Sequence, residues 1–156
     1  MNALGGYDLE DLVVGMNARF VKSLTERDIF MFAGACGDRN PVHLDEEYAK
    51  QTPFGGRIAH GMLSAAVISA AIAGRLPGPG SIYVSQNLRF VRPVKLGETV
   101  CATVTIKELI PGKRRVVLET VCDVDGRVVV DGDAVVAPTS LAQRMKDRPV
   151  AQASES

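Results

Sequence analysis

The chain has 156 residues, of which 18 are Lys or Arg and 18 are Asp or Glu, so its formal net charge at pH 7 is zero. This length suits one domain, and a hydrophobic fraction of 46% is ordinary for a globular protein. A protein that binds a nucleic-acid backbone needs an excess of positive charge, so nucleic acid is excluded as an expected partner. A small phosphate-bearing ligand needs only a local patch and is compatible with this composition.

The cysteines and the apolar segments bear on the compartment. Cys36, Cys101 and Cys122 are odd in number and lack CxxC spacing, which argues against a disulfide framework or a zinc site. The first residues are polar and acidic, so no signal-peptide pattern is visible. The longest apolar run, Ile58–Ala73, is shorter than the roughly 20 residues of a membrane span. We therefore expect a cytoplasmic protein with no membrane partner.

The first elements in chain order are a strand and a helix. Residues 1–16 read as an irregular lead-in, and Ala18–Leu24 has the composition of a strand. Thr25 is suited to cap a helix, and Asp28 completes a capping box, in which each side chain accepts from the other residue's backbone N–H. Glycines, the last being Gly37, weaken the end of this helix.

A polar segment, residues 37–43 (GDRNPVH), follows and holds one of only two histidines in the chain. Asn40-Pro41 predicts a turn, because proline disfavours helical angles in the residue before it. A short helix over Asp45–Lys50 and a loop over Thr52–Gly56 come next. The segment is therefore expected to be a loop between helices.

The run Ile58–Ala73 predicts the central helix. It is apolar almost all round and rich in Ala and Ser, so we expect protein to surround it and neighbouring elements to approach its backbone closely. Residues 74–80 contain two prolines and three glycines, which end the helix.

The rest of the chain up to residue 137 has the period-two pattern of strands. The expected strands are Ser81–Val91, Thr99–Leu109, Arg115–Val124 and Arg127–Ala137, and Asp125-Gly126 is a strong signal for a tight hairpin. This pattern predicts an antiparallel sheet with one face on the core. Residues 140–156 are polar and are expected to fray.

These elements predict one α+β domain, in which an antiparallel sheet of about four to five strands wraps around one long helix. Such a sheet leaves edge strands and an incompletely covered helix. Formation of a homodimer would bury both, so we expect a dimer.

The chemistry-bearing residues begin with Asp38 and His43, which lie on either side of the Asn40-Pro41 turn. A carboxylate and an imidazole form a common acid/base pair, because imidazole titrates near neutrality and the carboxylate can share its proton or fix its tautomer. The spacing alone equally fits an exposed Asp that caps the turn and a His that packs against it.

His60 and Gly61 mark the start of the long apolar run. A helix N-terminus offers free N–H groups and a positive dipole end, so the Gly61 N–H could bind an oxyanion. Gly61 could equally serve only close packing, and His60 fits a structural role better than a catalytic one. Ser64 and Ser69 lack the GxSxG context of a nucleophile.

The sequence also offers residues that could bind a metal ion or a phosphate group. Asp38, His43, His60 and Asp45 match no known metal-ligand spacing, so no metal site is expected. The densest cationic run of the strand half contains Arg89, Arg92 and Lys95, which could hold a phosphate group or could simply be solvated charges at a strand end.

Taken together, residues 32–43 (FAGACGDRNPVH), 54–63 (FGGRIAHGML), 87–94 (NLRFVRPV) and 97–98 (GE) resemble the MaoC-like (R)-specific enoyl-CoA hydratases. The resemblance covers roughly residues 15–137. It implies a single hotdog domain, paired as a homodimer, that hydrates trans-2-enoyl-CoA reversibly to (R)-3-hydroxyacyl-CoA. The coenzyme A thioester is then the substrate, and no cofactor or metal is implied.

The resemblance also implies roles for individual residues. Asp38 would activate water for attack at C3, and His43 would orient that water and help to return a proton to C2. Asn40 would shape the loop and hydrogen-bond the catalytic pair, and the Gly61 N–H would bind the thioester oxygen. Ser69 falls where relatives carry a serine that supports the active-site loop.

The sequence leaves several alternative functions open. A 3-hydroxyacyl-carrier-protein dehydratase would use the same residues, and a non-catalytic acyl-CoA-binding hotdog protein would not need both Asp38 and His43. A hotdog thioesterase would not need the hydratase string. The intact central helix favours short to medium acyl groups, and the sequence assigns no pathway among polyhydroxyalkanoate supply, fatty-acid oxidation and dicarboxylate assimilation.

Overall fold

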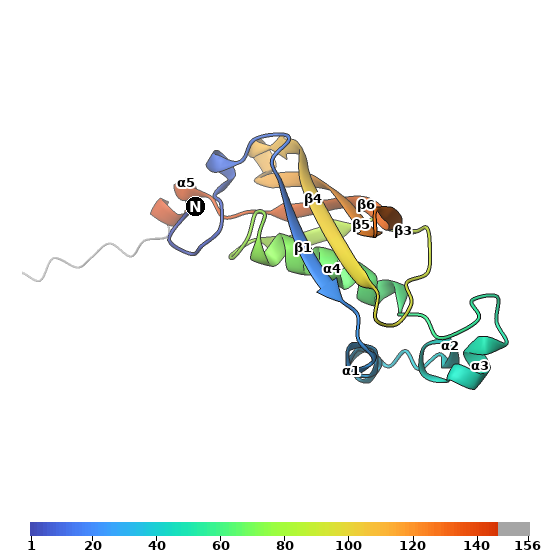
Figure 1. The fold of residues 1–156 in the computed structure, drawn as a ribbon. Helices are drawn as coiled ribbons and strands as arrows, with labels where there is room; N and C mark the ends of the chain where they lie inside the picture. The colour runs from blue at the N-terminus through green and yellow to red at the C-terminus, as the bar shows by residue number, and fades with distance from the viewer. Residues whose placement is uncertain (147–156) are drawn as a thin grey trace, which may run out of the picture.

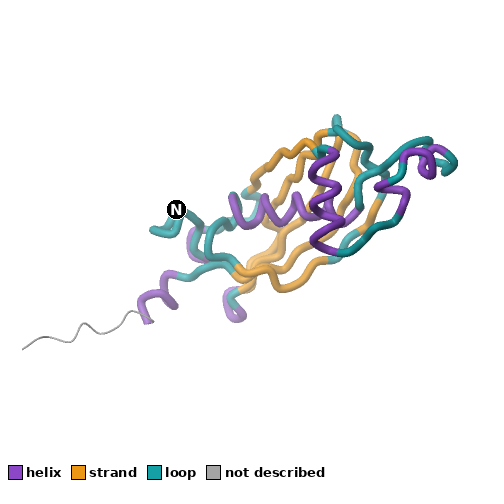
Figure 2. The backbone as a smooth tube through the Cα atoms, turned by 90° about the horizontal axis from the view of Figure 1, so that it is seen from below, coloured by secondary structure: helices purple, strands orange, loops and turns teal. Residues whose placement is uncertain are grey.

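A computed structural model describes residues 1–146 of the chain. Its strands form one curved antiparallel sheet in the order β1-β4-β5-β6-β2, and a short strand, β3, also pairs with β6. The sheet curls around the long helix α4 (Figures 1 and 2). The predicted α+β class is confirmed. The strands are β1 Asn17–Ser23, β2 Ile82–Gln86, β3 Arg89–Phe90, β4 Thr99–Ile110, β5 Arg115–Val124 and β6 Arg127–Ala137.

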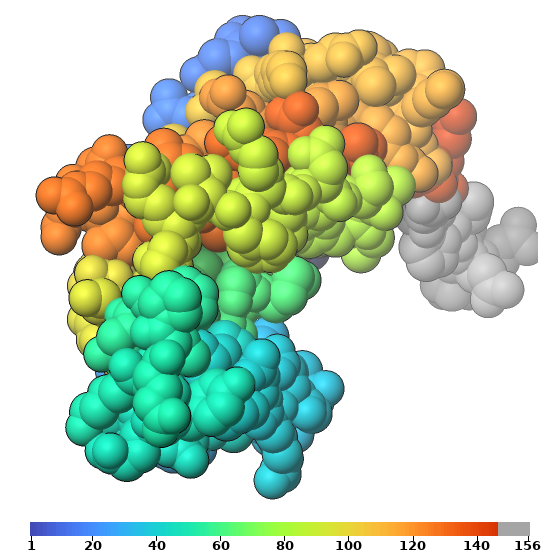
Figure 3. Space-filling view, turned by 90° about the vertical axis from the view of Figure 1, so that its right-hand side faces the viewer, coloured from blue at the N-terminus to red at the C-terminus, as the bar shows by residue number. Residues whose placement is uncertain are grey.

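The helices occupy three places around the sheet. The central helix lies against its concave face, and α1, α2 and α3 gather beyond one end, where they form a distinct lobe (Figures 1 and 3). The last helix, α5, lies near the N-terminal segment at the other end (Figure 1). The helices are α1 Glu26–Cys36, α2 Pro41–Leu44, α3 Glu46–Lys50, α4 Gly61–Gly74 and α5 Leu141–Lys146, with 3-10 turns at Leu9–Asp11 and Pro111–Lys113.

The predicted capping box at the start of α1 is present. The Thr25 hydroxyl accepts from the Asp28 N–H, and the Asp28 carboxylate accepts from the Thr25 N–H. The hydrogen bonds from Lys22 and Thr25 lower the pKa of Asp28 to about 2. At the other end, Gly37 closes the helix in the left-handed region at φ 83°, a conformation that glycine adopts without strain.

The central helix begins three residues later than predicted. Ile58 bridges to Lys95, and the Ala59 N–H donates to the Val94 carbonyl at 2.7 Å, so these residues are extended rather than helical. This short bridge ties the segment before α4 to the chain that follows β3. The segment before residue 61 is therefore held by contacts with the connection between β3 and β4, and α4 begins after them.

One side of α4 packs on the sheet, and the other side is exposed. Val67, Ile68, Ala71 and Ile72 join the sheet residues in the main hydrophobic core. The expectation that protein surrounds the whole helix is wrong for the single chain, because Met62, Ala66 and Ser69 are exposed along one helical face. The apolar sequence of α4 therefore leaves one apolar face of the helix uncovered in the single chain.

The predicted strand Ser81–Val91 divides into β2 and β3. At the break, Asn87 exchanges hydrogen bonds with the backbone of Asp133, at 3.0 Å from its N–H and at 2.9 Å to its side-chain oxygen. A Cβ on Gly132 would lie 2.0 Å from the Asn87 carbonyl oxygen, so the crossing depends on this glycine. The division turns the chain after β2 and brings β3 against β6.

The prediction of a frayed tail from residue 140 is wrong for residues 140–146. Ser140 is buried and donates to Glu10 at 2.7 Å, and Arg144 forms an ion pair with Asp8. Burial alone would raise the pKa of Asp8, but hydrogen bonds from Arg144 and its neighbours hold it below its usual value. The lead-in is therefore anchored too. The rest of the predicted tail, residues 147–156, lies outside the described residues.

The structure also bears on the predictions about disulfide bonds and membrane-spanning helices. All three cysteines are unpaired; Cys101 and Cys122 are buried, and burial is the main cause that raises the pKa of Cys122 to about 12. Within residues 1–146, none of the helices combines the length and apolarity that a membrane crossing requires.

Candidate active site

The polar segment leads from α1 into α2 and is shaped by its own side chains. The Asn40 N–H donates to Asp38 Oδ1 at 3.1 Å, and the Asn40 side-chain oxygen accepts from the Val42 N–H at 3.2 Å, capping α2. Pro41 occupies the first helical position, where its missing N–H costs nothing. These two hydrogen bonds hold Asn40 within the segment, and the Asp38 side chain remains 51% exposed.

His43 is buried and its ring is held in one orientation. Its Nδ1 lies 2.8 Å from the Ile58 carbonyl oxygen. A carbonyl oxygen only accepts hydrogen bonds, so Nδ1 carries the proton and Nε2 of the neutral ring carries a lone pair. That Nε2 lies 4.0 Å from Asp38 Oδ2, which is too far for a direct hydrogen bond but suits one bridging water.

His60 lies behind this pair as a structural support. Its Nε2–H donates to the Asp38 backbone carbonyl at 2.9 Å, and its ring stacks on His43 with centroids 4.0 Å apart. Phe32 of α1 also contacts the His60 ring, with 5.0 Å between centroids and 59° between the ring planes. His60 does not line the cavity described next, so its place fits the structural reading better than a substrate contact.

A cavity of about 280 Å³ opens beside His43. Gly61 and Ser64, on the first turns of α4, form part of its wall, and apolar side chains form most of the rest. Its lining residues are His43, Phe54, Ile58, Ala59, Gly61, Ser64, Phe90, Val91, Arg92, Pro93, Val94 and Val130. Asp38 is outside this set, but its carboxylate faces His43.

Gly61 is the first residue of α4 and forms part of the cavity wall. The first helical hydrogen bonds run from the Leu63 and Ser64 N–H groups to the His60 carbonyl, so the Gly61 N–H precedes them. A Cβ on Gly61 would lie 2.9 Å from two ring carbons of Phe90. Glycine at this position therefore makes room for the Phe90 ring.

The other candidate residues are separated in space. Ser69 lies on the exposed face of α4 rather than in the cavity, where Ser64 is the serine that lines the wall. Arg89 donates two hydrogen bonds to Asp131, which lower the pKa of that carboxyl and raise the pKa of Arg89. It is therefore already committed to a carboxylate.

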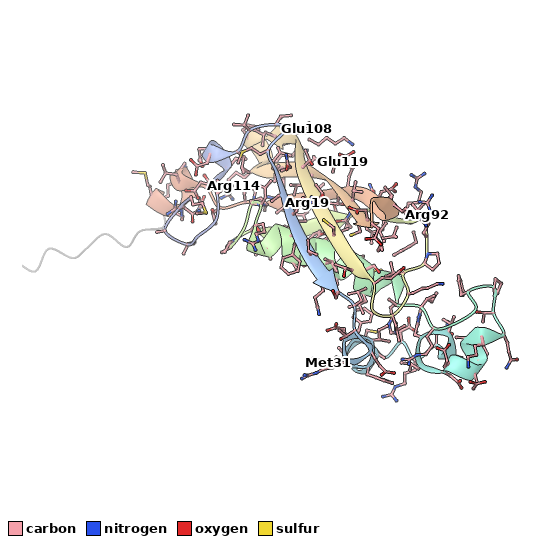
Figure 4. The ribbon with its side chains drawn as sticks, in the orientation of Figure 1. Arg19, Met31, Arg92, Glu108, Arg114 and Glu119 are labelled. Carbon is pink, nitrogen blue, oxygen red and sulfur yellow. The ribbon has the colours of Figure 1, made fainter. Side chains whose placement is uncertain are left out.

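Arg92 is the one of the three cationic candidates that borders the cavity. It also lines an adjacent pocket of about 200 Å³ together with Arg127 from the β5–β6 hairpin. The Arg92 side chain donates to the Val128 carbonyl at 2.7 Å and lies at the end of the sheet near β3 (Figure 4). Lys95 lines neither of these two pockets.

Asp38, His43 and His60 form the one group of potential metal ligands found within residues 1–146, with one donor atom from each inside 4.8 Å. The lone pairs of an imidazole lie in its ring plane. Because the two rings stack with 29° between their planes, their lone pairs do not converge at the 2.0–2.1 Å that a bound zinc requires. The donor set therefore suits a water better than an ion.

Sequence reasoning missed several residues of the site. The sequence patterns give no site role to Phe90, which lies within a predicted strand and a motif, to Arg127, which begins a predicted strand, or to Arg57, which lies inside a motif. Arg57 has a buried guanidinium that contacts His43, as described below. A charged residue within the FGGRIAHG segment, next to an expected helix start, was the available signal.

Comparisons with known proteins agree with the fold. Residues 13–127 match the family model described as the MaoC like domain. A protein with a single antiparallel sheet around one helix, and an Asp–His pair over that helix start, is a hotdog-fold protein of hydratase type. The chain belongs to the MaoC-like domain family.

Three relatives illustrate the similarity. The chain is 52% identical over 127 residues to the (R)-specific enoyl-CoA hydratase of Rhodospirillum rubrum, a match that covers 81% of this chain and 88% of that protein. It is 49% identical over 127 residues to the 3-hydroxybutyryl-CoA dehydratase of Methylorubrum extorquens, covering 81% of each. The unliganded R-hydratase PhaJ1 from Pseudomonas aeruginosa superposes with a TM-score of 0.82 at 49% identity, covering 86% of this chain and 87% of that one.

The packing of Phe90 on Gly61 is testable by a double-mutant cycle. Gly61→Ala should lower the free energy of unfolding by about 1 kcal/mol, because its methyl group would lie 2.9 Å from the Phe90 ring, which is 51% exposed and must move aside. In a Phe90→Ala background the same substitution should cost almost nothing. Urea denaturation of the four proteins measures both values, and an equal cost in the two backgrounds would contradict the packing account.

Proposed function

We propose that this protein is an (R)-specific enoyl-CoA hydratase, which adds water reversibly and in syn fashion to short and medium trans-2-enoyl-CoA thioesters. The observation that carries the proposal is the 4.0 Å gap between His43 Nε2 and Asp38 Oδ2, beside a cavity that reaches the start of α4. The relatives named above support the reaction class. The small cavity and the uninterrupted α4 favour shorter acyl chains.

The gap suits one water molecule bound by two acceptors. Hydrogen bonds of about 2.8 Å to both atoms, across their separation of 4.0 Å, leave an angle of roughly 90° at the water oxygen. An ionised Asp38 and a neutral His43 with its proton on Nδ1 both accept, so each takes one of the water hydrogens. The water's own lone pairs are then free to attack C3 of the enoyl group.

The reaction balances without a cofactor. The water oxygen bonds to C3 while one O–H bond breaks, and its proton passes to Asp38 or His43. Electrons from the C2=C3 bond move toward the thioester oxygen, and C2 then takes a proton from the same pair. Because oxygen and proton arrive from one side of the substrate, the addition is syn.

The start of α4 supplies the complementary charge. Negative charge grows on the thioester oxygen as water adds, and the Gly61 N–H and the positive end of the helix dipole stabilise it in the transition state. His60 holds the Asp38 loop against this helix start through its hydrogen bond to the Asp38 carbonyl. This hydrogen bond thus ties the Asp38 loop to the residue that precedes the Gly61 N–H.

A homodimer is part of the proposal. The edge strand β2 is largely exposed, Ile82 to 65%, and so is the face of α4 that carries Met62, Ala66 and Ser69. An unpaired strand edge beside exposed apolar side chains is a surface that a second copy would cover. Sedimentation equilibrium is expected to give the mass of two chains.

Substitution of the catalytic pair tests the proposed reaction. Asp38→Asn and His43→Gln should each lower the rate of crotonyl-CoA hydration at least about 100-fold, as expected when a general acid or base is removed. The assay follows the loss of enoyl absorbance, with chiral analysis of the product, which should be the R isomer. Glu47→Gln, an exposed carboxylate outside the cavity, is the matched control and should be unaffected. Full activity of both active-site variants would refute the mechanism.

The phosphates of coenzyme A are assigned to Arg92 and Arg127. Val130, in the cavity wall, lies three residues from Arg127 along β6, which is about 10 Å at 3.4 Å per residue. The pocket that holds Arg92 and Arg127, which Glu98 and Asp125 also line, is thus close enough to the cavity to support this assignment. A carrier-protein substrate, the alternative, has only one phosphodiester.

A substrate without phosphates tests whether Arg92 and Arg127 bind the phosphates of coenzyme A. Arg92→Ala and Arg127→Ala should each raise KM for crotonyl-CoA about tenfold with little change in kcat, because they remove binding that the ground and transition states share. For crotonyl-pantetheine, which lacks the phosphates, neither variant should matter. Arg89→Ala is the control, since Arg89 is bonded to Asp131. An equal rise in KM for both substrates would contradict the assignment.

A further inference from the structure

Arg57 has no part in the chemistry described so far, yet its charged side chain is only 9% exposed. It lies in the segment between α3 and α4. Its Nε donates to the His43 backbone carbonyl at 2.7 Å, and its Nη1 donates to Glu26 Oε1 at 2.6 Å. Its third nitrogen, Nη2, is buried and has no hydrogen-bond partner among residues 1–146. One guanidinium therefore links the start of α1 to α2.

The contact with His43 gives a hydrogen bond to a backbone carbonyl that has no donor within α2. The last carbonyls of a helix have no partner within it, and α2 has only four residues. The Arg57 guanidinium donates to one of them and places its charge at the negative end of the helix. Arg57 thereby caps the helix that carries the imidazole.

Residues 57 and 58 together hold His43 at two points. Arg57 binds the backbone carbonyl of His43, and the Ile58 carbonyl accepts from Nδ1 of its ring. The Ile58 N–H also donates to the carbonyl of Val42, one residue earlier, at 3.2 Å. With the backbone and the ring both held, only Nε2 is left to face Asp38.

The cost of burying the Arg57 guanidinium argues that its contacts do not serve mainly to stabilise the fold. Taking a guanidinium out of water is costly, and it is offset only where the pairing is complete. Here the acidic partner, Glu26, is 61% exposed, the Phe30 ring lies 5.4 Å from the guanidinium carbon, and one nitrogen has no hydrogen-bond partner among residues 1–146. The planar fork of Arg57 nevertheless reaches two acceptors at fixed angles, which the single ammonium of lysine does not reproduce.

We propose that Arg57 is a positioning residue that acts through His43, fixing the orientation in which the imidazole presents Nε2 to the water beside Asp38. The kinetic part of this inference rests on the proposed hydratase function, whereas the orientation of the ring does not. Arg57 touches neither substrate nor water in this account.

The kinetic test compares Arg57→Lys with Arg27→Lys. Arg57→Lys keeps the charge but loses the fork, so kcat for crotonyl-CoA should fall at least about tenfold with KM almost unchanged, as expected when a catalytic group is misplaced. Arg27 is exposed on α1, and its substitution should leave both constants unchanged. In a His43→Gln background, Arg57→Lys should lower the residual rate less than twofold. A similar loss with and without His43 would overturn the proposal.

A second readout does not depend on activity. The chain has two histidines, so ¹⁵N-histidine labelling gives one signal set for His43 and one for His60. In the wild type, His43 should be protonated on Nδ1 and His60 on Nε2. Arg57→Lys should raise the Nε2–H tautomer of His43 and leave His60 unchanged. Unaltered His43 signals would overturn the proposal even in an active enzyme, and altered signals would support it even if the wild type hydrates no enoyl-CoA.

Discussion

The hydrogen bond from His43 Nδ1 to the Ile58 carbonyl is the interaction on which the site depends. It determines which ring nitrogen carries the proton and therefore leaves a lone pair on Nε2, opposite the Asp38 carboxylate. With the opposite tautomer, Nε2 would donate instead of accept, and the pair would no longer share one water in the same way. Ile58 itself is held by its isolated bridge to Lys95, so the tautomer depends on the segment between β3 and β4.

The fold brings three distant segments to this bond. The capped helix α1 delivers the Asp38 loop, the segment before α4 supplies Ile58, and the chain after β3 supplies Lys95 and the cavity wall. His60 completes the arrangement, because it stacks on His43 and binds the Asp38 backbone. The catalytic pair therefore has few degrees of freedom, although the Asp38 carboxylate itself is half exposed.

Much of this could be predicted from local sequence, because local signals have local causes. The Thr25–Asp28 capping box and the strands on either side of Asp125-Gly126 follow from neighbouring residues alone. The break between β2 and β3 could not be predicted, since it depends on close approach to Gly132, more than forty residues away. The contacts of Arg57 were missed for the same reason: a buried cation is recognised only when its acceptors, on two other helices, are in place.

Neutron diffraction from a deuterium-exchanged crystal tests the central claim most directly, because it locates hydrogens. The account predicts deuterium on His43 Nδ1 and one water between the pair, with its two deuterons directed at His43 Nε2 and Asp38 Oδ2. Deuterium on Nε2 of a neutral His43, or a direct bond between the ring and the carboxylate with no water between them, would contradict it.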